Sequence, residues 1–190
     1  GVTEDYNGYR QEGMSKMDMT VKGGIRCSTA NAYLKPVLHR DNLTVITHAL
    51  TKRVILEGKK AIGIEYERNS ITQQVMANRE VILSAGSIGS PHILQMTGIG
   101  PAGVLKEAGI DVLHELPGVG ENLHDHLESV IQYETKLPVS LNRHMGPLGK
   151  FLIGARWYFF KSGLGATNHF ESTGFIRTHA GLKWPNVQFH

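Results

Sequence analysis

The feature that most constrains the fold is a strand of the buried type that runs directly into a small-residue turn and a helix. The run Glu80-Val81-Ile82-Leu83-Ser84 has a continuous apolar centre, which is typical of a strand covered on both faces in a parallel sheet. Small residues follow at 85–87, and Ser90-Pro91 predicts the start of a helix that continues to Met96. Because unpaired backbone N–H groups gather at the start of a helix, this order predicts a place where backbone can face an anion.

A small antiparallel meander is predicted before this strand. Residues 53–56 and 61–66 are rich in strand-forming side chains, and Glu57-Gly58-Lys59-Lys60 between them is typical of a hairpin turn. A β-rich run at 43–47 and a further strand at 73–77 would complete the meander. Residues 1–35 show no sustained periodicity, and we expect an extended loop region there, with a short helix from Ser28 to Leu38 at its end.

The sequence changes character after residue 127. A short helix at 103–108, ended by Gly109, belongs to the part before this point. The elements expected beyond it are a strand at 130–135, a helix at 148–160 and strands at 174–177 and 186–189. We therefore predict an α/β domain over 1–127, and an α+β domain with an antiparallel sheet over 128–190.

Composition excludes several classes of protein. With 41% hydrophobic and 19% charged residues, the chain can bury a core and is not disordered by composition. Its basic residues are dispersed and the formal net charge is only +3, so nucleic acid is not expected as a partner. The single Cys27 cannot form an internal disulfide, and no apolar run approaches the ~18 residues that span a bilayer. Glycine is frequent, 22 of 190 residues, which favours tight turns and close approach of backbone to a ligand such as a cofactor.

The run from Gly86 to Gly100 carries the strongest motif. Taken alone, it is equally well explained as an ordinary connection between a strand and a helix. Its small residues, Ser90-Pro91, paired aliphatic residues and closing Gly98-Ile99-Gly100 resemble the second signature of the glucose–methanol–choline (GMC) oxidoreductases. The run departs from that signature at Thr97, where the family usually has Ser, and a hydroxyl is kept. The resemblance implies FAD as the cofactor, with Ala85 and Gly86 close to it.

A second motif runs from Leu116 to His126. Its cluster His124-Asp125-His126 could suggest a metal site, but adjacent side chains of an extended segment point to opposite faces. No pair of Cys or Glu residues supports it at ligand spacing, and we expect no metal. The run resembles the family's segment beside the flavin, where Gln commonly stands at the position of His124. In that resemblance, Gly120 and Asn122 approach the flavin ring and Asp125-His126 holds the loop.

The family resemblance therefore implies one set of cofactor contacts. A further match, Thr47-His48-Ala49-Leu50, stands where the family's backbone meets the adenine end of the flavin. The residues implied to contact FAD are Ala49, Ala85, Gly86, Gly120, Asn122, Leu123, Asp125 and His126.

The third motif, residues 165–177, contains Glu171 next to Phe170. A carboxylate beside aromatic rings can bind a quaternary ammonium group through charge and contact with the ring faces. The alternative is a Glu at a strand edge in a salt bridge with Arg177. Choline-oxidising members of the family carry a Glu in a similar stretch, which implies that Glu171 binds the trimethylammonium group of the substrate.

The resemblance extends over nearly the whole chain and implies an internal part of a longer enzyme. No Gly-x-Gly-x-x-Gly fingerprint following a first strand opens the chain, and the family's late catalytic His is not identified in it, so we assign no catalytic residue here. The resemblance implies oxidation of choline to betaine aldehyde by hydride transfer to FAD, a step toward glycine betaine. Electrons would pass to a quinone or respiratory carrier, in the bacterial cytoplasm, at the membrane periphery, or in a mitochondrion. The alternatives are a GMC dehydrogenase of another primary alcohol (aliphatic, polyethylene glycol or sugar) and an inactive flavin-binding homologue.

Overall fold

The computed structural model describes all residues from 1 to 190, which divide into two compact units. One unit is continuous, Thr44–Ile131, and we call it the helix–meander unit. The other combines Gly1–Leu43 with Gln132–His190, and we call it the split unit. Each is described by itself. The assignment of 1–127 to a cofactor domain and 128–190 to a substrate domain stays a prediction, because contacts alone group the first 43 residues with the last 59.

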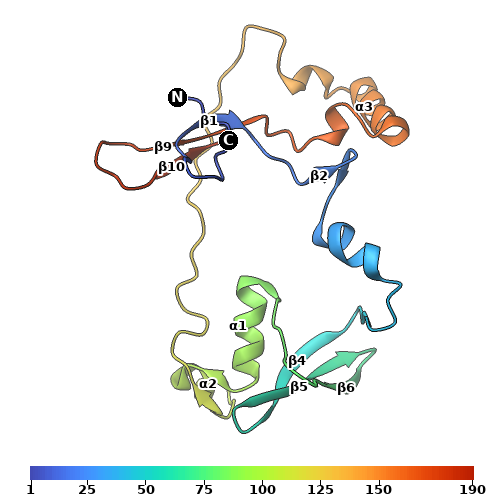
Figure 1. The fold of residues 1–190 in the computed structure, drawn as a ribbon, viewed down its shortest axis with the longest axis vertical. Coiled ribbons are helices and arrows are strands. Elements are labelled where there is room, and N and C mark those ends of the chain that lie inside the picture. The colour runs from blue at the N-terminus through green and yellow to red at the C-terminus, as the bar shows by residue number, and fades with distance from the viewer. The chain divides into compact units, whose positions relative to one another are not determined.

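The helix–meander unit is built on a three-stranded antiparallel sheet. Its strands are β4 (Leu50–Glu57), β5 (Lys60–Arg68) and β6 (Ile71–Met76), in the order β4-β5-β6 (Figure 1). Gly58 takes a left-handed φ of 58° between β4 and β5, as the tight hairpin turn requires. Asn69 and Ser70 are both left-handed between β5 and β6, which is the two-residue turn that matches the twist of paired strands. The predicted meander is confirmed, although residues 43–47 contribute no strand to it.

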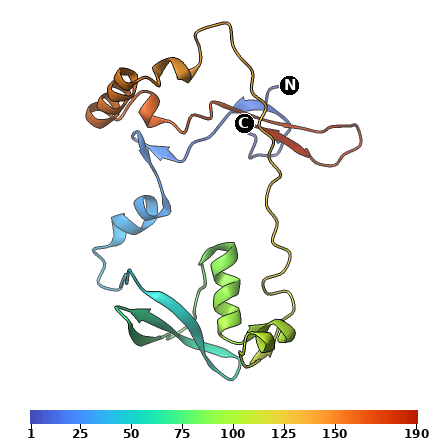
Figure 2. The same cartoon turned by 180° about the vertical axis from the view of Figure 1, so that it is seen from behind.

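Helix α1 (Gly86–Met96) packs against β4, and the chain then makes a small parallel pair around a second helix. That pair joins β7 (Ile99–Gly100) to β8 (His114–Glu115), with α2 (Ala102–Glu107) between them (Figure 2). The buried apolar side chains of the whole chain all lie in this unit: Val54, Tyr66, Leu105 and Val119. The unit therefore has a small core of its own.

Two sequence predictions near α1 are wrong in detail. Residues 80–84 are not part of any strand, because the chain places no parallel neighbour beside them to complete a ladder. The helix also begins at Gly86 rather than at Pro91, which lies inside it. Ser90 does not cap a helix start; its hydroxyl oxygen instead accepts a hydrogen bond from the backbone N–H of Ala85 at 2.9 Å.

The split unit contains a second antiparallel sheet, in the order β1-β9-β10. It consists of β1 (Gly13–Lys16), β9 (Ser172–Ile176) and β10 (Val187–Phe189), with a separate hairpin of β2 (Val21–Lys22) and β3 (Ile25–Arg26). The predicted strands at 174–177 and 186–189 are confirmed as β9 and β10. The prediction of a loop over 1–35 is wrong, since β1 pairs with β9. Thr173 is 1% exposed, and its hydroxyl donates to the carbonyl oxygen of Phe189 across the sheet.

Helix α3 (Pro147–Phe160) is the main helix of the split unit and confirms the helix predicted over 148–160. The indole Nε1 of Trp157 donates to the carbonyl oxygen of Gly24 at 2.7 Å, which ties α3 to the β2–β3 hairpin. The remaining helical elements are single short turns: η1 (Ala30–Leu34), η2 (Lys35–Val37), η3 (Leu141–His144) and η4 (Leu164–Ala166). The strand predicted over 130–135 does not form, since that segment has no pairing partner.

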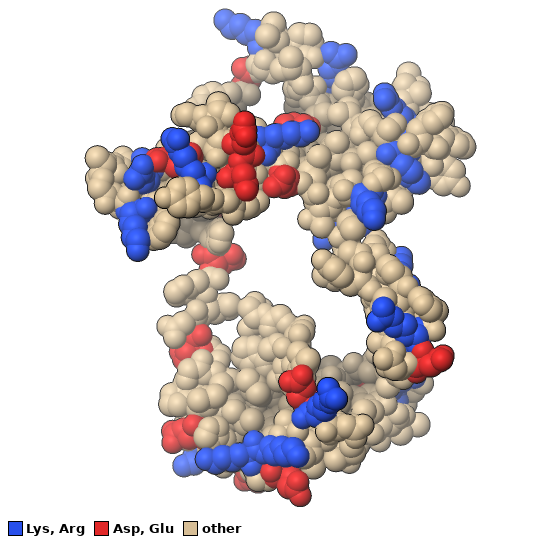
Figure 3. Space-filling model, in the orientation of Figure 1, with Lys and Arg blue, Asp and Glu red and all other residues tan.

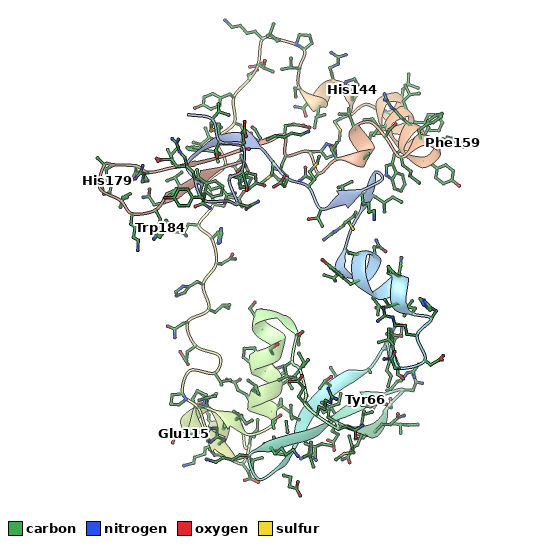
Figure 4. All side chains as sticks on the ribbon, in the orientation of Figure 1. Tyr66, Glu115, His144, Phe159, His179 and Trp184 are labelled. Carbon is green, nitrogen blue, oxygen red and sulfur yellow. The ribbon has the colours of Figure 1, made fainter.

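Charge is spread unevenly over the split unit. In Figure 3 both signs occur around its sheet, whereas the part that contains α3 shows Lys and Arg side chains without Asp or Glu; the sequence has no acidic residue between Glu134 and Glu171. Helix α3 also exposes aromatic side chains, and the ring of Phe159, 72% exposed, projects from its outer face (Figure 4). No helix has the combination of length and apolar content that crossing a bilayer requires. Together the two antiparallel sheets and their helices give the mixed α/β class that the sequence predicted.

Candidate cofactor and substrate sites

The N-terminal end of α1 is open to a ligand. Ala85 is the residue before the helix, and no side chain caps the first turn. The first N–H groups of a helix have no partner within it, so those of α1 remain available. Gly86 has a left-handed φ of 85°, and a Cβ added there would meet no atom of the chain. Glycine is therefore required for its backbone conformation, and the space before it fits the close approach of an anionic group.

Ala85 also borders a cavity shared with the meander. The cavity has a volume of about 400 Å³, and its lining includes Thr51 of β4, Ala85 and Ile93 of α1. Ala49 is half-buried immediately before β4, and the preceding His48 has a left-handed φ of 54° that only a minority of non-glycine residues adopt. The structure thus brings the strand that follows Ala49 and the turn at Ala85 to one cavity.

The loop after β8 is fixed at the opposite end of α1. The side-chain Nε2 of Gln95 donates to the carbonyl oxygen of Val119 at 3.2 Å. Gly120 follows with a left-handed φ of 85°, and Asn122 is left-handed at 56°. Gly86 and Gln95 are nine residues apart on the helix, which corresponds to about 14 Å along its axis. A ligand that contacted both the Gly86 turn and the Gly120 loop would have to be extended.

The remaining predicted residues of this loop are exposed. Leu123 and His126 lie on the surface of the unit, and Asp125 accepts a hydrogen bond from the backbone N–H of His126 at 2.8 Å. This bond is local, so the role of Asp125 and His126 in holding the loop stays a prediction. The structure groups no three His, Cys, Asp or Glu side chains in a way that could hold a metal ion. The alternative of a metal site at 124–126 therefore gains no geometric support.

Glu171 lies in the split unit, directly before β9, and its side chain is exposed. The alternative that it pairs with Arg177 is wrong. Arg177 instead pairs with Glu12, with 2.5 Å between a guanidinium nitrogen and a carboxylate oxygen. The hydrogen bond from Arg177 lowers the pKa of Glu12 below its ordinary value, and the same bond raises the pKa of Arg177. Arg177 is the one arginine that the sequence suggested as a partner of Glu171, and it does not bind the Glu171 carboxylate.

The turn before Glu171 is shaped by its own side chains. Thr167 and Asn168 accept hydrogen bonds from the backbone N–H groups of His169 and Phe170, respectively. The ring of Phe170 meets the ring of His190 edge to face, with centroids 5.2 Å apart. Residues 165–168 of the same turn line a cavity of about 520 Å³ that also includes the indole of Trp157. The segment that carries Glu171 therefore holds an exposed carboxylate next in sequence to the ring of Phe170.

Comparison with known proteins decides the family. The model of the GMC oxidoreductase family matches residues 1–128. The chain belongs to the GMC oxidoreductase family. This GMC chain is 58% identical over 188 residues to a Photobacterium profundum protein named oxygen-dependent choline dehydrogenase, covering 99% of this chain and 33% of that protein. It is 52% identical to a protein of the same name from Vibrio vulnificus, covering 99% of this chain and 34% of that protein.

Solved structures agree with this placement of the GMC chain. An FAD-dependent oxidoreductase from Chaetomium thermophilum superposes with a TM-score of 0.73 at 26% identity. The match covers 86% of this chain and 30% of that one. The chain therefore spans about a third of the length of the relatives it matches.

Sequence reasoning missed two residues of the GMC signature that shape the site. Thr97 is 4% exposed, and its hydroxyl accepts from the backbone N–H of Val54 at 2.9 Å while donating to the carbonyl oxygen of Ile93. Gln95 holds the loop before Gly120. The role of Thr97 could have been inferred from the hydroxyl that is retained at this position, because a buried N–H on an edge strand such as β4 needs a hydrogen-bond acceptor. The role of Gln95 could have been inferred from its position as a single amide side chain in the otherwise apolar end of the helix.

Proposed function

We propose that the full-length protein containing this chain is an FAD-dependent dehydrogenase that oxidises choline to betaine aldehyde. The observation that carries the proposal is the 58% identity, over 99% of this chain, with a protein named oxygen-dependent choline dehydrogenase. Membership of the GMC family supports the broader statement, oxidation of an alcohol with FAD. Choline as the substrate is the finer part of the proposal.

The residues present fit FAD as the cofactor. The uncapped start of α1 and the open space before Gly86 suit a negatively charged part of FAD. Ala85 would contact it from the cavity at that end and Ala49 from the position directly before β4, while the loop residues Gly120 and Asn122 would contact it from the other end. Leu123, Asp125 and His126 complete the proposed set. When bound, FAD supplies the electron acceptor for the oxidation of the alcohol carbon.

Glu171 would select the substrate by its charge. Burying a carboxylate against a neutral alcohol is costly, whereas a trimethylammonium group compensates the charge and contacts aromatic faces as well. Arg177 does not neutralise Glu171, because it is bound to Glu12. The base that takes the proton of the choline hydroxyl is expected outside residues 1–190.

The electron acceptor is a separate part of the proposal. We expect a quinone or respiratory carrier, reached from the cytoplasm, the membrane periphery or a mitochondrion. The relatives carry the words oxygen-dependent in their names, so oxygen is the competing acceptor to be measured.

The test is an activity comparison on purified full-length protein. Choline is compared with its neutral isostere, in which a tert-butyl group replaces trimethylammonium, and each is assayed with oxygen and with a soluble quinone. We expect bound FAD, turnover of choline and a much lower kcat/KM for the isostere. Equal kcat/KM values for both substrates would argue against choline as the substrate and would favour an FAD-dependent dehydrogenase of another primary alcohol. Bound FAD without turnover of either would point to an inactive homologue.

A further inference from the structure

The side chain of Gln95 joins the last turns of α1 to the loop that carries Gly120 and Asn122. Its Nε2 donates to the carbonyl oxygen of Val119 at 3.2 Å, and the side chain is half-buried. Val119 itself belongs to the small core of the helix–meander unit. A donor at this point satisfies a carbonyl group that folding removes from bulk water, so the bond favours one position of the loop.

Gln95 and Gly120 also fit each other sterically. A Cβ added to Gly120 would lie 2.8 Å from the Nε2 of Gln95, which is closer than ordinary packing permits. The left-handed φ of Gly120 would disfavour a side chain in any case. The amide of Gln95 therefore occupies the space that a side chain at position 120 would need. A side chain at position 120 would displace the amide of Gln95 from its bond with Val119, in addition to the strain of the left-handed φ.

The rest of the loop has few regular ties. The N–H of Leu116 donates to the carbonyl oxygen of Gly100, and two tight turns follow, from Val119 to Leu116 and from Glu121 to Gly118. From residue 122 to residue 131 the chain belongs to no helix or strand. The bond from Gln95 is thus a tie from a packed helix that lies next to Gly120 in sequence, whereas the bond between Asp125 and His126 is local to the loop.

The end of α1 from which Gln95 reaches is itself anchored. The buried hydroxyl of Thr97 accepts from Val54 N–H of β4 at 2.9 Å and donates back to Ile93 of the helix at 2.7 Å. Strand β4 thereby fixes the last turn of α1, and α1 in turn fixes Gln95. A side chain on such a support can set the position of a loop more accurately than one on a free surface.

We propose that Gln95 is a positioning residue, which holds the loop of Gly120 and Asn122 in the place where it contacts the cofactor. The proposal deepens the proposed function and rests on it, because the cofactor is FAD. Gln95 touches the loop backbone and acts on the cofactor only through it.

The test compares three variants of the full-length protein with wild type. Gln95→Leu removes the amide at similar size. Gln95→Glu keeps the shape but replaces the donor with a carboxylate that faces a carbonyl oxygen. Gln74→Leu is the matched control, since Gln74 lies on β6 of the same unit and its amide bonds to Glu65 away from the loop. Two quantities are measured: hydrogen exchange of peptides covering 113–131 in FAD-free protein, and the Kd of FAD from flavin fluorescence.

Loss of one such hydrogen bond should raise the FAD Kd by about 5- to 10-fold in Gln95→Leu, and by at least as much in Gln95→Glu. Exchange over 113–131 should accelerate in both variants, whereas Gln74→Leu should change neither quantity. Unchanged exchange in Gln95→Leu would overturn the proposal, and so would faster exchange with an unchanged Kd. If wild type bound no FAD, the proposed function and the positioning role would both fall. The exchange data would still show whether Gln95 holds the loop.

Discussion

The two units of the chain are stabilised by different interactions around the residues proposed to bind the cofactor and the substrate. The helix–meander unit contains all four buried apolar side chains, and its proposed cofactor residues Ala49, Ala85 and Gly86 stand on or next to packed elements. The split unit buries no apolar side chain, and its buried side chains are those of Thr3 and Thr173. Its sheet is joined by backbone pairing, the Thr173 hydroxyl and the pair of Glu12 with Arg177. From this difference we expect substitutions near the cofactor residues to lower both stability and FAD binding. Substitutions near Glu171 should weaken substrate binding alone.

The largest expected effect is that of Leu105→Ala. Leu105 is 1% exposed, and truncating such a side chain costs about 2–5 kcal/mol through lost burial and the cavity left behind. Thermal unfolding of the full-length protein should therefore begin at a clearly lower temperature. Leu148→Ala on the exposed side of α3 is the control and should have little effect. A comparable loss from Leu148→Ala would show that the full-length protein covers α3, and the contrast between the units would not survive in the intact molecule.

Glu171→Gln should act on substrate binding and spare the cofactor. If the carboxylate meets the trimethylammonium group, removing its charge costs about 1–3 kcal/mol, or roughly 5- to 150-fold in apparent affinity. The KM for choline should rise more than kcat falls, with an unchanged FAD content. The tert-butyl isostere should be nearly indifferent to the substitution. Equal sensitivity of both substrates would make Glu171 a structural residue and leave choline specificity without a residue to explain it.

Gly86→Ala tests the other unit. A side chain at a left-handed φ costs about 1–2 kcal/mol, and here it would also stand at the uncapped start of α1. Both the unfolding temperature and the FAD content should fall. Gly103→Ala in α2 is the matched control, since its Cβ would meet no neighbour, and it should stabilise by about 0.4–1 kcal/mol. Normal FAD content in Gly86→Ala would remove this turn from the proposed cofactor site.

The smallest effect is expected at Glu12, and it depends on pH. Because Arg177 lowers the pKa of Glu12, the pair stabilises the folded state above the ordinary value near 4.5, and this contribution is lost as the pH falls through the lowered pKa. Glu12→Gln should therefore lower the unfolding temperature slightly at neutral pH and leave it unchanged in strong acid. Glu4→Gln, an exposed glutamate of the same unit, provides the comparison. An acid-independent effect of Glu12→Gln would mean that the charge pair is not its cause.

The sequence predicted those elements whose partners lie close along the chain. The β4–β5 hairpin and α3 follow from a turn sequence and from helical spacing, both of which are local. The apolar run at Val81-Ile82-Leu83 looked like a buried parallel strand, but a strand of that kind exists only with neighbours, and the described chain supplies none. The same reason explains the missing strand at 130–135. Strand β1 was missed for the opposite reason, because its partner β9 lies far along the sequence.

The candidate site was predictable in its list of residues but not in its geometry. The family resemblance named Gly120, yet only the structure shows that Gln95 fills the space beside it. The resemblance also named Glu171. Whether Arg177 binds Glu171 or Glu12 depends on which strands pair, and only the structure shows that it binds Glu12. Contacts across 24 or 165 residues of sequence leave no local pattern to read.

The discontinuity of the split unit has a consequence for the order of events during synthesis. Gly13 of β1 pairs with Phe175 of β9, so β1 must wait until 162 further residues have been made. At the usual rate of elongation this takes roughly 8–32 s, during which the continuous helix–meander unit has already left the ribosome in full. The emerging chain therefore presents an unpaired β1 edge for all of that time, and such an edge invites pairing with another chain. Residues 1–43 should accordingly contribute to the chaperone dependence of the nascent protein before Glu171 has been made.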